Sequence, residues 1–142
     1  MLRKSSADIH RLDPDACRIF NQMCDSIPHP TAIVISSSWR YTYSCDHLSG
    51  ILGRNGIKQA VIGFTPTANA YEDRSRGKEI NQYLHSFRKR VVLDSYVVID
   101  DDMHDILTEI PSKNIVYCDH FVGFTEADSE RAKQILTMTD YL

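Results

Sequence analysis

The chain has 142 residues, of which 42% are hydrophobic and 25% charged, and this ordinary composition predicts one globular domain with its own core. The same composition excludes a collagen-like, coiled-coil or wholly disordered chain. The net charge of −3 argues against a protein that wraps duplex nucleic acid through a strongly positive surface, but it leaves room for a local basic patch.

The sequence indicates a short arm followed by a folded core. Residues 1–11 show no clear hydrophobic periodicity, whereas residues 12–139 alternate apolar helix faces with short β-branched runs. In chain order the pattern predicts a helix from 13 to 24, a strand at 31–35, a helix at 46–54, a strand at 60–64, a helix at 77–88, a strand at 95–99, a short helix at 105–109, a strand at 114–117 and a last helix from 125.

Local signals support the expected helix ends. Asp13-Pro14 combines a capping side chain with a proline that suits the first helical turn. Asn55-Gly56 is typical of a helix that ends in a left-handed residue, and Thr125 with Asp128 has the spacing of a capping box.

The alternation of helices and strands predicts a single α/β domain over residues 1–142. We expect a Rossmann-like parallel sheet of about four strands with helices on both faces. The strand at 31–35 is continuously apolar, which predicts that both of its faces are covered. In such folds ligands bind at the carboxyl ends of the strands, so polar residues at these ends are the first candidates for a site.

An acidic turn follows the strand at 95–99. Asp100, Asp101 and Asp102 are consecutive, and Asp105 lies one helical turn beyond Asp101. Carboxylates crowded in this way repel one another unless a cation neutralises them, and Mg²⁺ prefers such oxygen ligands. The alternative is a solvated acidic loop that caps the next helix.

A serine-rich turn follows the strand at 31–35. Ser36, Ser37 and Ser38 offer hydroxyl and N–H groups that could cradle a phosphate, although a plain turn has the same composition. Trp39-Arg40 adds a stacking face and a bidentate cation, which suit a base or a phosphate; the alternative is that Trp39 simply packs.

Basic residues precede and open the helix at 77–88. Arg74, Arg76 and Lys78 oppose the helix dipole there, which suggests that an anion compensates them. A phosphate ester is one candidate; the other is the set of nearby acids, namely Glu72, Asp73 and Glu79.

The remaining features point to a reduced, cytoplasmic protein. The four cysteines lie far apart and form no CxxC pair, so we expect free thiols. Cys118 and His120 lack a second ligand pair, and a zinc site is therefore not expected. No apolar run approaches the ~18 residues of a membrane helix, and the basic N-terminus lacks the apolar stretch of a secretory signal.

Six segments, taken in order, resemble the haloacid dehalogenase (HAD) superfamily. They are Leu12-Asp13-Pro14, Ile33 to Arg40, Ile62 to Pro66, Arg76 to Ile80, Tyr96 to Asp102 and Gly123 to Ala127. The resemblance is to the small HAD domains of the Swiss Army Knife RNA-repair type, which are related to the phosphatase half of polynucleotide kinase-phosphatase.

The resemblance implies a Mg²⁺-dependent phosphatase that forms an aspartyl-phosphate. It implies that Ser36 binds the transferred phosphoryl group and that Arg76, less favourably Lys78, is the cation of the site. Asp100 and Asp101 would be the metal ligands, Asp101 would take part in catalysis, and Asp105 would support the metal. Ser37, Ser38, Arg40 and Lys78 are the further candidates for contacts to substrate.

The sequence departs from the family pattern at the first motif. The resemblance implies a strand that ends in Asp-x-Asp, whose first aspartate is the nucleophile, well before Leu12. Asp8-Ile9-His10 is the nearest approach, but it follows Lys4-Ser5-Ser6-Ala7 and no apolar run. The missing strand would lie between the strands at 31–35 and 95–99, so we expect a rearranged sheet or an oligomer in which a neighbouring chain fills the gap.

Three functions follow from this. The favoured one is an HAD-like domain that keeps phosphate-binding and Mg²⁺-binding motifs but is impaired or inactive as a phosphatase. The second is an active Mg²⁺-dependent phosphatase for nucleotide or nucleic-acid phosphate ends, with the nucleophile supplied elsewhere. The third is a non-catalytic protein that binds a partner.

Overall fold

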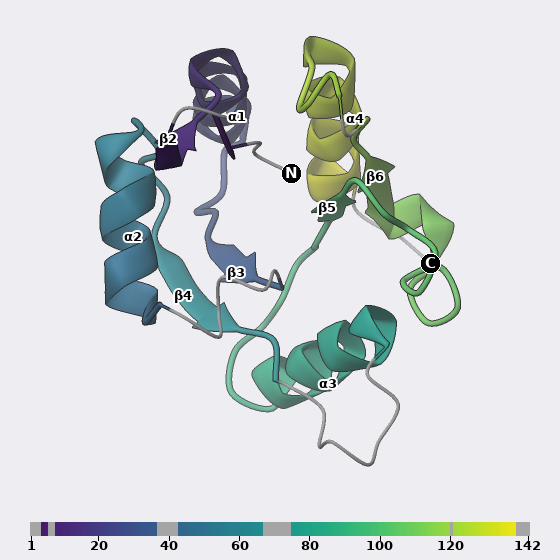
Figure 1. Ribbon diagram of the computed structural model, residues 1–142. Helices are drawn as coiled ribbons and strands as arrows, with labels where there is room; N and C mark the ends of the chain where they lie inside the picture. Colours follow the sequence, from purple (N-terminus) through teal and green to yellow (C-terminus); the bar gives the residue numbers. More distant parts are fainter. Residues whose placement is uncertain (1–3, 6–7, 37–42, 67–74, 120, 139–142) are drawn as a thin grey trace.

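The computed structural model describes residues 4–5, 8–36, 43–66, 75–119 and 121–138. The elements, in order, are β1 (Lys4–Ser5), β2 (Asp8–Leu12), α1 (Pro14–Ser26), β3 (Ile33–Ile35), α2 (Cys45–Arg54), β4 (Val61–Phe64), α3 (Arg76–Arg88), β5 (Val98–Asp100), a 3₁₀ turn (Ser112–Asn114), β6 (Ile115–Tyr117) and α4 (Glu126–Thr137). The α/β class and the parallel strands flanked by helices are confirmed (Figure 1).

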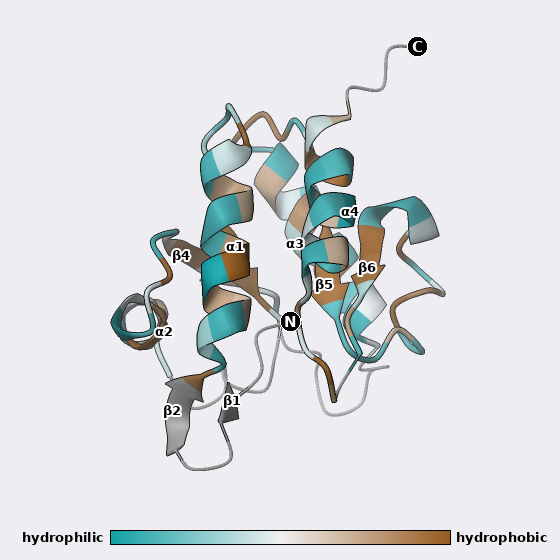
Figure 2. Ribbon diagram, turned by 90° about the horizontal axis from the view of Figure 1, so that it is seen from above, coloured by the Kyte–Doolittle hydropathy of each residue, from teal (hydrophilic) through white to brown (hydrophobic). Residues whose placement is uncertain are grey.

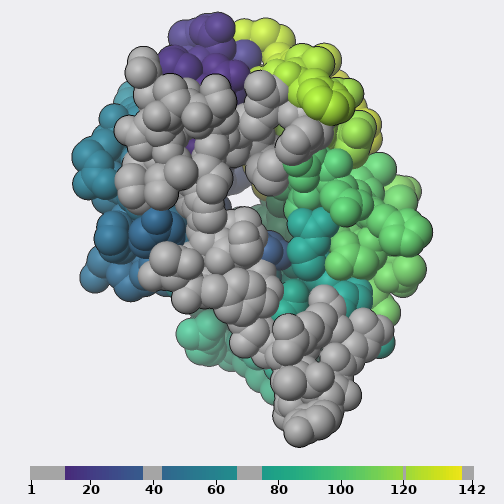
Figure 3. Space-filling model, viewed as in Figure 1, coloured from purple at the N-terminus to yellow at the C-terminus, as the bar shows by residue number. Residues whose placement is uncertain are grey.

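The strands of the core form two parallel pairs. β3 pairs with β4, with Val34 opposite Gly63, and β5 pairs with β6, with Ile99 opposite Val116. In the described part of the chain these pairs are not joined into one sheet, so the expected sheet of about four strands is divided between β3 and β5. The space-filling view shows an opening through the molecule between these two halves (Figure 3).

Two local expectations are corrected. The N-terminal arm contains an antiparallel pair, β1 with β2, in which Leu12 donates its N–H to Asn55 Oδ1 at 2.9 Å. The short helix expected at 105–109 is a run of hydrogen-bonded turns, in which the N–H groups of Ile106 and Leu107 both reach Met103 O at 3.0 Å. The turns span residues 104–109, and Pro111 follows too closely for an α-helix to continue from them.

The expected helix ends are confirmed. Asp13 caps α1 through a hydrogen bond from the N–H of Asp15, with Pro14 in the first turn. Thr125 and Asp128 form a reciprocal capping box at the start of α4. Gly56 follows α2 with φ of +89°, a conformation that a residue with a Cβ adopts only with strain.

The core consists of three clusters that share elements. α1 directs Ala16 and Ile19 towards α4 and β6, and directs Cys17 towards α2 and β4. A third cluster joins α3 to the turn at 103–110 and to β6. Figure 2 shows α1 and α4 side by side, with largely hydrophobic strands behind them and hydrophilic outer faces.

The inner strands are only half covered. Ile33, Val34 and Ile35 of β3 are all half-buried, so the expectation that this strand is covered on both faces is wrong. Val98 and Ile99 of β5 are half-buried as well. Both strands face the division between the two halves, which explains their exposure.

Candidate functional site

The polar residues of interest follow the carboxyl ends of the parallel strands, as the fold predicts. Ser36 follows β3, Thr65 follows β4, and Asp100 is the last residue of β5. The two strand ends of the first pair are held together, because Thr65 donates its N–H to Ile35 O at 3.0 Å. In the second pair, Cys118 donates its N–H to Asp100 O at 2.8 Å.

Arg76 connects the start of α3 to the acidic turn. Its Nη1 donates to Asp100 Oδ2 at 2.6 Å, and its Nη2 donates to the backbone oxygen of Asp102 at 2.6 Å. Its Nε donates to Asp105 Oδ1 at 3.4 Å. A guanidinium has donors in a rigid planar fork, so one side chain can hold these three acceptors at once.

The start of α3 is itself built on Asp105. The N–H of Arg76 donates to Asp105 Oδ2 at 3.0 Å, and Ser75 Oγ donates to Asp105 O at 2.9 Å. Gly77 allows this close approach, because a Cβ at its position would lie 2.9 Å from Asp105 O and 2.9 Å from Glu109 Cβ. The carboxylate near the helix N-terminus is also favoured by the helix dipole.

These contacts identify the anions that compensate Arg76. The sequence offered a phosphate or the neighbouring acids Glu72, Asp73 and Glu79. Glu72 and Asp73 lie outside the described residues, and within these residues Arg76 forms its ion pairs with Asp100 and Asp105. Asp105, expected to support a metal, orients the cation of the site.

Asp100 is the most constrained carboxyl group of the turn. Only 7% of the residue is exposed, and burial raises its pKa above the ordinary value, with a further increase from the adjacent Asp101 carboxyl group. Arg76 and the N–H of Asp102, which donates to Asp100 Oδ1 at 3.0 Å, lower the pKa. Two carboxyl groups therefore crowd one another at the end of β5, and Arg76 balances part of their charge.

This donor set fits Mg²⁺ in part. The described residues contain no group of three or more histidine, cysteine, aspartate or glutamate side chains arranged to hold a metal ion. Asp100 and Asp101, however, interact directly, and Mg²⁺ is often held by one or two carboxylates and several waters. The pair therefore fits Mg²⁺ by the chemistry of its donors, and the supporting role of Asp105 stays a prediction.

The serine turn is described only at its first residue. Ser36 is half-buried at the end of β3, whereas Ser37, Ser38, Trp39 and Arg40 lie outside the described residues. Lys78 lies in the first turn of α3, exposed, and its N–H donates to Ser75 Oγ at 3.5 Å.

Thr65 is a polar residue that the sequence reasoning missed. It is 4% exposed, and its Oγ1 has no hydrogen-bond partner among the residues that the structure describes. A buried hydroxyl without a partner costs roughly 1–3 kcal/mol. Its signal in the sequence was the same as that of Ser36, a hydroxyl directly after an apolar strand.

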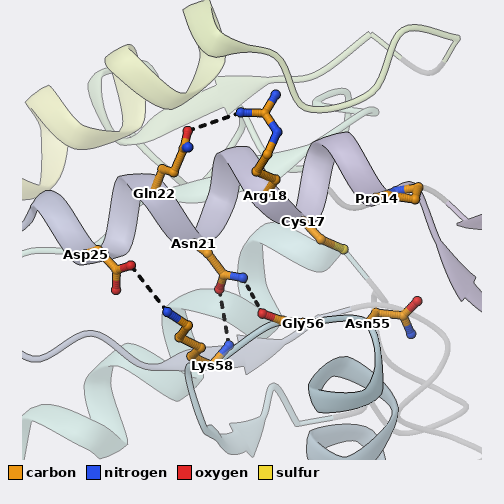
Figure 4. A pocket seen from close by; sticks show the side chains of 9 residues that line it. All are labelled: Pro14, Cys17, Arg18, Asn21, Gln22, Asp25, Asn55, Gly56 and Lys58. Atoms are coloured by element: carbon orange, nitrogen blue, oxygen red, sulfur yellow. Dashed lines mark hydrogen bonds and ion pairs between the residues drawn. The ribbon is translucent and has the colours of Figure 1, made fainter.

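A cavity of about 350 Å³ lies elsewhere, between α1 and the turn that follows α2 (Figure 4). Its polar side chains bind one another: Asn21 accepts from the N–H of Lys58 at 3.2 Å and donates to Gly56 O, and Lys58 pairs with Asp25 at 3.6 Å. These contacts stabilise the packing of α1 on the turn. Because the polar side chains of this cavity are already paired, the carboxyl ends of the strands are the stronger candidate for a functional site.

Comparisons with known proteins agree with this architecture. A family model described as the HAD domain in Swiss Army Knife RNA repair proteins matches residues 2–129. Searches of the curated proteins and of the solved structures find no match to this chain. Within the described residues, no helix combines the length and apolar character that crossing a membrane requires. The family match covers most of the chain, and the chain belongs to the HAD domains of Swiss Army Knife RNA repair proteins.

Proposed function

We propose that this HAD domain binds the phosphorylated end of a nucleotide or nucleic acid and that its own phosphatase activity is impaired or absent. The observation that carries the proposal is the Arg76 network at the end of β5. Asp100 and Asp105 fix Arg76 in place and compensate its charge, so a phosphate would be attracted by Arg76 together with a Mg²⁺ ion held by the carboxylate pair.

Each residue of the site has a proposed role. Ser36 donates its hydroxyl to the phosphate, and Thr65 offers a second hydroxyl from the neighbouring strand end. Arg76 neutralises phosphate charge, with help from Lys78. Ser37, Ser38 and Arg40 would contact the rest of the ligand. Positioning and charge neutralisation are the main requirements of phosphoryl-group recognition.

Asp100 and Asp101 would hold Mg²⁺. When bound, the ion would neutralise phosphate oxygens and relieve the repulsion between the two carboxylates. Arg76 keeps Asp100 oriented, and Asp105 keeps Arg76 oriented through its contacts at the start of α3.

The proposed impairment rests on the first motif of the family, which residues 1–11 do not show. An aspartyl-phosphate requires a carboxylate that attacks phosphorus, and the segment before Leu12 contains no apolar strand that ends in Asp-x-Asp. Asp8 begins β2, where it pairs with Ser5 in a small antiparallel ladder. A site that binds phosphate without this carboxylate would hold its ligand and release no phosphate.

A second candidate is an active phosphatase whose nucleophile comes from another chain. The division between the two sheets favours it. Alternate residues of a strand direct their backbone groups to opposite edges, so Val34 and Ile99 direct theirs away from β4 and β6. A strand from a second copy could pair with both edges, which would make the active form a homo-oligomer. A protein that only binds a partner remains a third candidate.

Titration calorimetry with Mg²⁺, inorganic phosphate and vanadate tests the first proposal, together with release of phosphate from an aryl phosphate. We expect binding of phosphate in the presence of Mg²⁺, loss of binding in Asp101→Asn, and little or no turnover. Asp46→Asn, an exposed acid in the first turn of α2, is the matched control.

The outcomes separate the candidates. The second candidate is supported by phosphate release that is lost in Asp101→Asn and whose rate per chain rises with protein concentration. Turnover that is unaffected by Asp101→Asn excludes the proposed site. Absence of phosphate binding leaves partner binding as the remaining function.

A further inference from the structure

The loop between β6 and α4 exposes apolar side chains at the carboxyl end of the second strand pair. Phe121 is 83% exposed and Val122 is 61% exposed, although both lie in a chain segment that is firmly held at each end. Before the loop, Cys118 is buried at 1% exposure, and after it Phe124 is buried at 3% and packs edge-on against Phe20 at 6.1 Å.

The exposed segment is fixed by hydrogen bonds. Asp119 Oδ1 accepts the N–H of Phe121 at 2.8 Å and the N–H of Val122 at 3.1 Å. Gly123 donates its N–H to Asp119 O at 2.8 Å and has φ of +83°, which favours glycine. Phe121 is therefore exposed while its own backbone is held by Asp119.

This turn lies next to the candidate site. Cys118 is bonded to Asp100 O, and Phe121 follows it by three residues, a reach of at most about 11 Å. Figure 2 shows the hydrophobic part of the loop that precedes α4 extending past the ends of β5 and β6. A ligand whose phosphate binds at Arg76 would thus meet an exposed aromatic ring at the same end of the second strand pair.

We infer that Phe121 is a stacking surface for the nucleobase of the ligand whose phosphate binds at the Arg76 site. This inference rests on the proposed function and names its substrate class: a phosphorylated nucleoside or the terminal nucleotide of RNA. A single base stacked on an aromatic side chain contributes roughly 1–3 kcal/mol, which converts to about a 5- to 150-fold gain in affinity. Stacking accepts every base, so no preference among the four bases is expected.

The test compares ligands that carry both base and phosphate with ligands that lack one of the two. Binding of adenosine 5′-monophosphate, adenosine 3′-monophosphate, ribose 5-phosphate and adenosine is measured by titration calorimetry in the presence of Mg²⁺. We expect the better of the two nucleotides to bind at least about 5-fold more tightly than ribose 5-phosphate. Phe121→Ala should abolish this advantage and leave the affinity for ribose 5-phosphate unchanged, and Phe121→Trp should restore it.

Val92→Ala is the matched control, because Val92 is 87% exposed and lies in another connection of the chain, between α3 and β5. It should leave all affinities unchanged. Both Phe121 variants should fold, since the side chain contributes little buried surface.

The outcomes distinguish this inference from the proposed function. Equal affinity for nucleotide and ribose 5-phosphate, or an advantage that survives in Phe121→Ala, overturns the stacking role and leaves the phosphate site intact. Adenosine that binds as tightly as the nucleotides, with sensitivity to Phe121→Ala, supports stacking and contradicts the phosphate site. Absence of binding overturns both, and self-association that is lost in Phe121→Ala assigns the turn to a contact between copies.

Discussion

Arg76 offers the sharpest test of how the site is held together. Replacement by methionine keeps most of the apolar stem and removes the donors to Asp100 and Asp105. Removing one partner of a buried ion pair costs roughly 3–5 kcal/mol. The Arg76 side chain is 26% exposed and that of Asp100 is 10% exposed, so solvent screening reduces the expected loss to about 2–3 kcal/mol.

Urea unfolding followed by circular dichroism measures this loss. With a slope of about 2 kcal/mol per M, the midpoint should fall by roughly 1 M. The fold should survive, because the Ser75 hydroxyl and the N–H of Gly77 still donate to Asp105 O and hold α3 to it. Arg131→Met, an exposed position on α4, is the control and should change the midpoint little.

A double-mutant cycle with Asp100→Asn shows whether the loss comes from this pair. The variant that carries both changes should lose less free energy of unfolding than the sum of the single variants, by about 1 kcal/mol or more. Additive losses, or a loss below about 0.5 kcal/mol for Arg76→Met, would refute the view that Arg76 and Asp100 hold one another in place.

Three further predictions concern stability. Gly77→Ala should lower the free energy of unfolding by about 1–3 kcal/mol, because the new Cβ would meet Asp105 O. At Gly53 a new Cβ would have nothing within 4 Å, so Gly53→Ala should raise the free energy of unfolding by about 0.5–1 kcal/mol. Thermal unfolding compares the two variants. Thr125→Ala removes a cap and should cost about 1 kcal/mol in urea unfolding, and an unchanged midpoint would contradict the capping box. Burial raises the pKa of the Cys17 thiol from 9.0 to about 11, so the thiol ionises in the unfolded state before it does in the folded state. The free energy of unfolding should therefore fall as the pH rises from 9 to 11, and it should fall less steeply in Cys17→Ala. Equal slopes of this free energy against pH in the two proteins would contradict the prediction.

Local features of the fold were predictable from the sequence. The caps at Asp13 and Thr125 and the left-handed Gly56 depend on residues within a few positions of each other, and all three are confirmed. The existence of the strands was also predictable, because short apolar runs between predicted helices are typical of buried strands. Their pairing was not, since it depends on contacts between residues tens of positions apart.

The contacts of the candidate site were likewise not predictable where they join residues far apart in the sequence. The charge pattern indicated that Arg76 needs an anion, but only the fold places Asp100 and Asp105 beside it, 24 and 29 residues away. Thr65 was missed because a threonine after a strand is common, and it is distinguished only by its burial without a hydrogen-bond partner in the part of the chain that the structure describes. The roles of Ser37, Ser38 and Arg40 stay predictions, as they lie outside the described residues.

The division of the core has a consequence for how the molecule opens. Only α1 contributes buried residues to both the cluster with α4 and the cluster with α2, whereas β6 contributes to the clusters with α4 and α3, all among the described residues. Loss of the α1 contacts would release α2 and β4 as a unit while α4, β6 and α3 stay packed. Amide hydrogen exchange should therefore reveal two cooperative steps, with α2 losing protection before β6.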